Sequence, residues 1–79
     1  MGINEKMKEL GHITAQRREE LEMSQEATVD FASESVGVRT LSSFECGKGN
    51  IGLRKLIALL DVLGMDLKIQ VRNTVPDGR

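Results

Sequence analysis

The side chains best suited to recognise another molecule lie in residues 36–50. Four of them share one side of a short helical pattern: Val38, Arg39, Ser42 and Ser43. An arginine guanidinium can donate two hydrogen bonds to O6 and N7 of one guanine, which is worth about 1–3 kcal/mol of discrimination between bases. Serine hydroxyls bond bases or phosphates, and valine can touch a thymine methyl. All four are candidate base readers; the alternative is an ordinary solvated helix surface.

A helix over about residues 37–47 is needed to present these side chains. Leu41 and Phe44 lie three residues apart and predict its inner side, with Val36 as an anchor just before it. Gly47 closes the pattern, as a glycine commonly does after a helix. A second helix precedes it, because Ser24 is a good N-cap residue. Two short helices joined by a turn have the layout of a helix-turn-helix, which places its second helix in the DNA major groove.

Two more helices are predicted from periodicity and caps, over residues 6–22 and 52–63. In the first helix, Leu10, Ile13, Arg17 or Arg18, and Leu21 recur at helical spacing. The inner side of the second helix is predicted to hold Ala27 or Thr28, Val29, and Phe31 to Ala32. The last helix is the most apolar, with Leu53, Leu56, Ile57, Leu59, Leu60 and Leu63. Gly64 stands where a left-handed residue usually ends a helix. Apolar and polar residues then alternate over 67–72, which predicts a half-buried strand.

The positive charge is concentrated where the helix-turn-helix interpretation needs it. The whole chain of 79 residues has a net charge of −1. Residues 1–35 hold four basic and eight acidic side chains, whereas residues 36–55 hold four basic and one acidic. A basic segment at the recognition helix favours contact with phosphates, although chance segregation is the competing explanation.

Composition excludes several classes of site and of protein. One cysteine, Cys46, and one histidine, His12, provide neither a disulfide nor a zinc cluster. No catalytic constellation and no phosphate-binding glycine motif is present, so we expect no enzyme activity and no cofactor. No apolar run approaches the roughly 20 residues of a membrane span, and the first residues lack a signal-peptide core. These features predict a cytoplasmic protein without a membrane partner.

The order and spacing of several short motifs resemble the XRE family, the phage repressor and Cro type of helix-turn-helix. The matching positions are Arg18, Met23-Ser24-Gln25-Glu26, Val36, Thr40-Leu41, Phe44-Glu45 and Gly47-Lys48. The resemblance covers about residues 10–67 and implies a mainly all-α, lambda-repressor-like domain of four to five helices. The interval from Gln25 to Val36 is about two residues longer than is usual in the family. An alternative register therefore takes Gly37-Val38 as the family's glycine-valine pair.

The resemblance also assigns roles outside the recognition helix. It implies phosphate contacts by Gln25 at the start of the second helix and by Lys48 and Asn50 in the loop after the third. Arg17 and Gly37 complete the set of candidate phosphate contacts. Arg18 and Glu45 match positions that form an ion pair between the first helix and the end of the recognition helix. This pair is expected to stabilise the fold.

The C-terminal pattern is similar to that of HipB-type antitoxins, in which a strand after the fourth helix builds the dimer. A single strand cannot satisfy its own backbone groups, so pairing with the same strand of a second copy is the economical arrangement. The dimerisation residues would be Leu67, Ile69 and Val71, and the alternative is an extended tail without a partner. The predicted organisation is 1–9 as N-terminal extension and start of the first helix, 10–66 as DNA-binding domain, 67–72 as dimerisation strand and 73–79 as disordered tail.

These expectations predict a homodimeric transcriptional regulator that binds a palindromic operator in double-stranded DNA through the major groove. A repressor is the general form, and an autoregulating antitoxin with a cognate toxin protein is the sharper one. The alternative is a protein-protein interaction module that neutralises a partner and has little DNA affinity. Salt dependence separates the two, because binding through several phosphates weakens steeply as salt rises.

Overall fold

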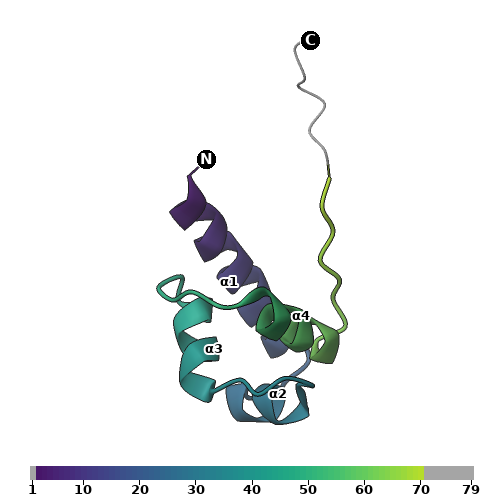
Figure 1. Cartoon of the computed structure of the whole chain (residues 1–79). Coiled ribbons are helices and arrows are strands. Elements are labelled where there is room, and N and C mark those ends of the chain that lie inside the picture. The colour runs from purple at the N-terminus through teal and green to yellow at the C-terminus, as the bar shows by residue number, and fades with distance from the viewer. Residues whose placement is uncertain (1, 71–79) are drawn as a thin grey trace, which may run out of the picture.

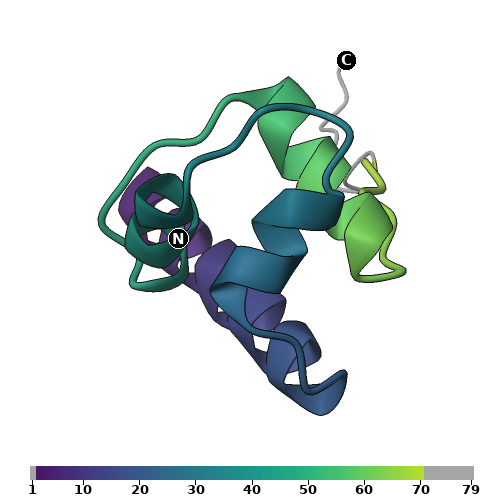
Figure 2. The same cartoon turned by 90° about the horizontal axis from the view of Figure 1, so that it is seen from below.

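The computed structural model describes residues 2–70, which form four helices connected by short segments (Figure 1). Their bounds are α1 Ile3–Glu20, α2 Gln25–Phe31, α3 Val38–Glu45 and α4 Leu53–Val62. Seen from below, α2 lies between α3 and α4 (Figure 2). The fold is mainly helical, in agreement with the predicted class, and residues 2–70 contain no strand. None of the described helices is both long enough and apolar enough to cross a membrane.

The core lies between α3, α4 and the segment before α3. Its buried residues are Val36, Leu41, Phe44, Leu56, Leu59 and Leu60. Partly buried side chains from other parts of the chain pack against it: Met7, Val29, Ala32, Ile51 and Met65. The predicted inner side of α3 is therefore confirmed, and the apolar pattern of α4 supplies the other three core residues. By contrast, Leu53 and Ile57 of α4, which belong to the same apolar pattern, remain 61% and 43% exposed.

α1 differs from its prediction in where it begins and in what it buries. It starts at Ile3, three residues before the predicted Lys6, and ends at Glu20. Its buried residues are Gly11 and Thr14, while the larger residues of the apolar pattern stay partly exposed: Leu10, Ile13 and Leu21. The reason is the close approach of α3, since a Cβ atom on Gly11 would collide with the carbonyl oxygen of Phe44. Only a glycine admits that contact.

α2 begins as predicted but exposes its last residue. The hydroxyl of Ser24 accepts a hydrogen bond of 3.0 Å from the amide of Ala27, which is an N-cap contact. Thr28 is fully buried, and its hydroxyl donates to the Ser24 carbonyl at 2.8 Å. A buried hydroxyl thereby keeps a partner. Phe31 is 74% exposed, so its predicted place on the inner side is wrong. Residues 32–37 then connect α2 to α3.

Two glycines end helices in the left-handed conformation that the sequence predicted for one of them. Gly64 has a φ of 70° after α4, and Gly47 has a φ of 75° after α3. Backbone of this hand is strained for residues with a Cβ atom, so glycine suits both places.

Residues 65–70 follow α4 without regular secondary structure. The predicted strand 67–72 is therefore not formed within the described chain, where residues 2–70 provide no second strand for it to pair with. Ile69 is 91% exposed and Leu67 is 41% exposed. Val71 and the predicted tail 73–79 lie outside the described residues.

Candidate nucleic-acid interface

α3 carries the four candidate base readers on a helix whose other side is fully buried. Leu41 and Phe44 are 0% and 1% exposed, which fixes the helix against the core. Arg39 is exposed, whereas Val38, Ser42 and Ser43 are half-buried. All four lie within the eight residues of α3, at the i, i+3 and i+4 spacings that bring side chains to one side of a helix. The structure thus brings the four together, with Arg39 the most accessible.

The loop after α3 covers part of one candidate. The amides of Lys48 and Gly49 both donate to the carbonyl oxygen of Ser43, at 3.0 and 3.3 Å. The loop passes so close that a Cβ atom on Gly49 would lie 2.9 Å from the Cβ of Ser43. Ser43 therefore has less free surface than Arg39, and its backbone anchors the loop. Lys48 and Asn50 of that loop are exposed.

Gly37 is the N-cap of α3 and makes no side-chain capping bond. The first amides of a helix have no partner within the helix, and the helix dipole makes this end attractive to anions. Lys48 and Asn50 lie at the opposite end, after the last residue of α3. Three of the predicted phosphate contacts therefore flank α3.

The other two predicted phosphate contacts have partners inside the protein. The Nε atom of Arg17 donates to the carbonyl oxygen of Leu63 at 2.9 Å, and its Nη1 atom lies 3.3 Å from a carboxylate oxygen of Glu20. Arg17 thus joins α1 to the C-terminal end of α4. The Nε2 atom of Gln25 donates to Oε1 of Glu45 at 2.9 Å. The structure does not place Arg17 with the residues that flank α3.

Arg18 and Glu45, predicted as an ion pair, are brought into two-point contact. Arg18 Nε lies 2.8 Å from Oε2 of Glu45, and Nη2 lies 2.9 Å from Oε1. The side chains are only 14% and 6% exposed. The pKa of the Arg18 guanidinium is raised above its ordinary value, because its hydrogen bonds to Glu45 favour the charged form. The carboxylate at the end of α3 is therefore held by a permanent cation from α1.

Further contacts extend this pair into a cluster that holds three helices. Nη1 of Arg18 donates to the carbonyl oxygen of Met23 at 2.9 Å, just before α2. Gln25, in the first turn of α2, donates to the same carboxylate of Glu45. The cluster fixes the end of α3 relative to α1 and α2, which is what presentation of an outer helix surface requires. Sequence reasoning missed the part that Gln25 plays here, because the contact spans 20 residues and has no local pattern.

The described residues contain no candidate metal centre beside α3. Residues 2–70 contain no group of three histidine, cysteine or acidic side chains that could hold a metal ion. Cys46 is a free, exposed cysteine that caps the end of α3. No protein-family model, curated protein or solved structure matches this chain closely enough to assign it to a family.

Proposed function

We propose that this protein is a sequence-specific DNA-binding transcriptional regulator, a repressor that binds a palindromic operator as a homodimer. The observation that carries the proposal is the contrast between the two sides of α3. Leu41 and Phe44 are buried and Glu45 is clamped by Arg18, while Arg39 projects freely. A helix with its side chains is about 10–12 Å wide and fits the major groove of B-DNA.

Arg39 is the principal base reader in this proposal. It lies on the second residue of α3, and the first half of a recognition helix is the part that reaches base edges. Its guanidinium would bond O6 and N7 of one guanine, with Val38 and Ser42 on adjacent bases. Ser43 contributes less, because the loop that follows α3 covers part of it. The recognised sequence would thus be anchored by one guanine in each half-site.

Phosphate contacts come from both ends of α3. The uncapped amides at Gly37 favour an anion, and the exposed Lys48 and Asn50 can bond the DNA backbone. Residues 36–55 supply a net charge of +3 beside an acidic N-terminal region. These contacts provide affinity without sequence information, and they predict a steep loss of binding as salt rises.

An autoregulating antitoxin is the narrower form of the proposal, with a cognate toxin as a further partner. A second candidate function is a protein-protein interaction module with little DNA affinity. The observation that favours it is the exposure of large apolar side chains at Phe31, Leu53 and Ile69. Binding through such surfaces would change little with salt, whereas DNA binding would weaken steeply.

The test is selection of bound sequences from a random double-stranded DNA pool, with the wild type and Arg39→Ala side by side. We expect an enriched inverted repeat, and we expect Arg39→Ala to lose its preference at one position of each half-site by about 5- to 100-fold. Lys6→Ala is the matched control, since it removes an exposed cation from α1 and leaves α3 intact. A pool without enrichment, or an unchanged preference in Arg39→Ala, would count against DNA reading by α3.

A further inference from the structure

One stripe of α4 faces away from the core along its whole length. Leu53, Arg54, Ile57 and Asp61 are exposed, while Leu56, Leu59 and Leu60 are buried. The first of these is 61% exposed and Ile57 is 43% exposed. The four exposed positions recur at the spacing of neighbouring turns, so they form one continuous surface. We call these four residues the α4 stripe.

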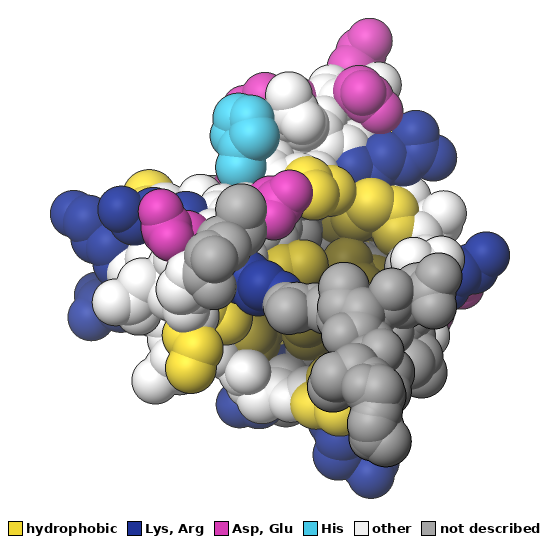
Figure 3. Space-filling view, turned by 90° about the horizontal axis from the view of Figure 1, so that it is seen from above, with side chains coloured by type: hydrophobic (Ala, Val, Ile, Leu, Met, Phe, Trp, Pro, Cys, Tyr) yellow, Lys and Arg dark blue, Asp and Glu magenta, His cyan; other side chains and the backbone are white. Residues whose placement is uncertain are grey.

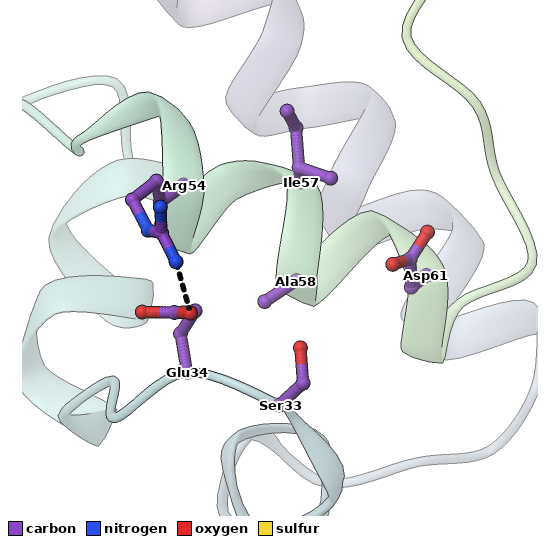
Figure 4. Close-up of a pocket in the computed structure, with 6 residues that line it drawn as sticks. All are labelled: Ser33, Glu34, Arg54, Ile57, Ala58 and Asp61. Carbon is purple, nitrogen blue, oxygen red and sulfur yellow. Dashed lines mark hydrogen bonds and ion pairs between the residues drawn. The ribbon is translucent and has the colours of Figure 1, made fainter.

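Hollows lie on both sides of the α4 stripe. On one side, a hollow is bounded by the segment before α3 and contains Ser33, Glu34 and Ala58 beside the stripe (Figure 4). On the other side, a second hollow is bounded by Met65, Leu67 and Ile69. Ile57 and Asp61 line both hollows. Seen from above, hydrophobic side chains reach the surface of the molecule between charged ones (Figure 3). The stripe is therefore a ridge that another helix could cover.

The two charges of the stripe are placed against the dipole of their own helix. Arg54 is in the first turn of α4 and Asp61 is in the last, whereas acids are favoured at the start of a helix and bases at the end. Arg54 lies 3.2 Å from a carboxylate oxygen of Glu34, but its side chain is 86% exposed. Within residues 2–70, Asp61 has no salt bridge. The exposed ion pair with Glu34 accounts for Arg54 only in part, and no salt bridge among residues 2–70 accounts for Asp61.

A second copy of the same helix, packed antiparallel, would satisfy both charges. Arg54 and Asp61 are seven residues apart, or two turns and about 10 Å along the axis. When two such helices run in opposite directions, Arg54 of each faces Asp61 of the other, and Ile57 lies beside the two-fold axis. Each charge then also meets the favourable dipole end of the partner helix. Neither DNA nor an unrelated apolar surface offers this reciprocal match.

We propose that the α4 stripe is the homodimer interface, formed by antiparallel packing of α4 on α4 of a second copy, with two reciprocal Arg54–Asp61 ion pairs around Leu53 and Ile57. Leu67 and Ile69 line the hollow next to the stripe, so the segment predicted to pair as a strand extends the same interface. The inference rests on the homodimer of the proposed function and defines the residues that build it.

Charge exchange tests the proposal in the full chain without DNA. Sedimentation equilibrium would compare the wild type with Arg54→Asp, Asp61→Arg and the double variant that carries both changes. Each single reversal places like charges opposite each other and should weaken dimerisation by at least about tenfold. The double variant restores the ion pairs in reverse and should return to within about threefold of the wild type.

The control uses the neighbouring cation on the same turn. Lys55 is exposed but lies outside the stripe, so Lys55→Asp should leave the dimer unchanged although it changes the net charge as Arg54→Asp does. Lys55→Asp combined with Asp61→Arg has the same net charge as the exchanged pair and should remain weakened. Thermal melting of each variant checks that it folds.

Three results would overturn the interface: a wild type that is monomeric at its highest soluble concentration, an exchanged variant that stays weakened, or an equal loss in Lys55→Asp. Each of these concerns self-association alone. A protein that dimerises as described but enriches no DNA sequence would leave the interface standing and remove the DNA-binding proposal. The reverse result, DNA reading by a monomer, would remove only the interface.

Discussion

The inner side of α3 and the α4 stripe differ in how far their charged and apolar side chains are buried. At α3, an arginine and a glutamate are nearly buried and joined by two hydrogen bonds of 2.8 and 2.9 Å. On α4, Arg54 is 86% exposed in its side chain, and Leu53 and Ile57 contact solvent. Close contacts within the chain therefore hold α3 in place, whereas the outer side of α4 is exposed to solvent.

This difference indicates which surfaces are covered by other parts of the same chain and which are not. The position of α3 is set by contacts with α1 and α2, so its outer side chains can act from a fixed support. Large apolar groups in contact with water contribute no burial free energy, and a contiguous apolar patch commonly marks an interaction surface. We therefore expect a partner to bind the α4 stripe and not the inner side of α3, which is already buried within the chain.

Among the polar contacts, the largest expected effect is at the cluster that holds α3. Glu45→Ala should lower the free energy of unfolding by about 3 kcal/mol, because it leaves the nearly buried Arg18 without its carboxylate. The pKa of Arg18 is raised because its hydrogen bonds to Glu45 favour the charged guanidinium, so the arginine keeps its full contribution to the pair at neutral pH. Urea unfolding followed by circular dichroism measures the change.

Glu34→Ala is the matched control for this change, because it removes the carboxylate from the solvent-exposed ion pair of Arg54 with Glu34. The pair of Glu34 with Arg54 is open to water, and such pairs contribute about 0–1 kcal/mol. Similar losses for the two variants would show that burial does not distinguish these regions.

Gly11→Ala should give the next largest effect. It should destabilise the protein, although helix propensity alone predicts stabilisation. Replacing a glycine inside a helix by alanine usually stabilises it by about 1 kcal/mol. Here the added Cβ atom would meet the Phe44 carbonyl oxygen, so we expect a net loss of about 2 kcal/mol as α1 and α3 separate. The same urea titration measures it.

Gly52→Ala serves as the control for Gly11→Ala, since nothing lies within 4 Å of a Cβ atom there. It should cost less than about 1 kcal/mol, the usual range for an N-cap residue. A stabilised Gly11→Ala variant would mean that α1 and α3 have room to spare.

The sequence predicts those parts of the fold that depend on strong local signals. The buried leucines of α4, the pair Leu41 and Phe44, the Ser24 cap and the left-handed Gly64 all follow from spacing and residue type. The buried side of α1 could not be predicted in this way. Hydrophobic periodicity favours Leu10 and its neighbours, whereas a close approach of two helix backbones selects the smallest residue.

The candidate site shows the same limit at the level of single contacts. The pair of Arg18 and Glu45 could be predicted because a family resemblance marks both positions. Arg17 bonds the carbonyl oxygen of Leu63, 46 residues away, and that contact depends on where α4 ends relative to α1. A strand over 67–72 requires a second strand, which the described residues of one chain do not supply.

The smallest effect is expected at the exposed end of α2, where the two phenylalanines of the chain provide a matched pair. Phe31 is 74% exposed, so Phe31→Ser should change the free energy of unfolding by less than about 0.5 kcal/mol. Phe44→Ala is the contrast, because its side chain is 1% exposed and removal of a buried phenylalanine costs about 3–5 kcal/mol. Phe31 also lines a hollow that includes Asp61. A clear loss of stability in Phe31→Ser would show that Phe31 contributes to the stability of the single chain. The exposed surface available to a partner would then be limited to α4 and residues 67–70.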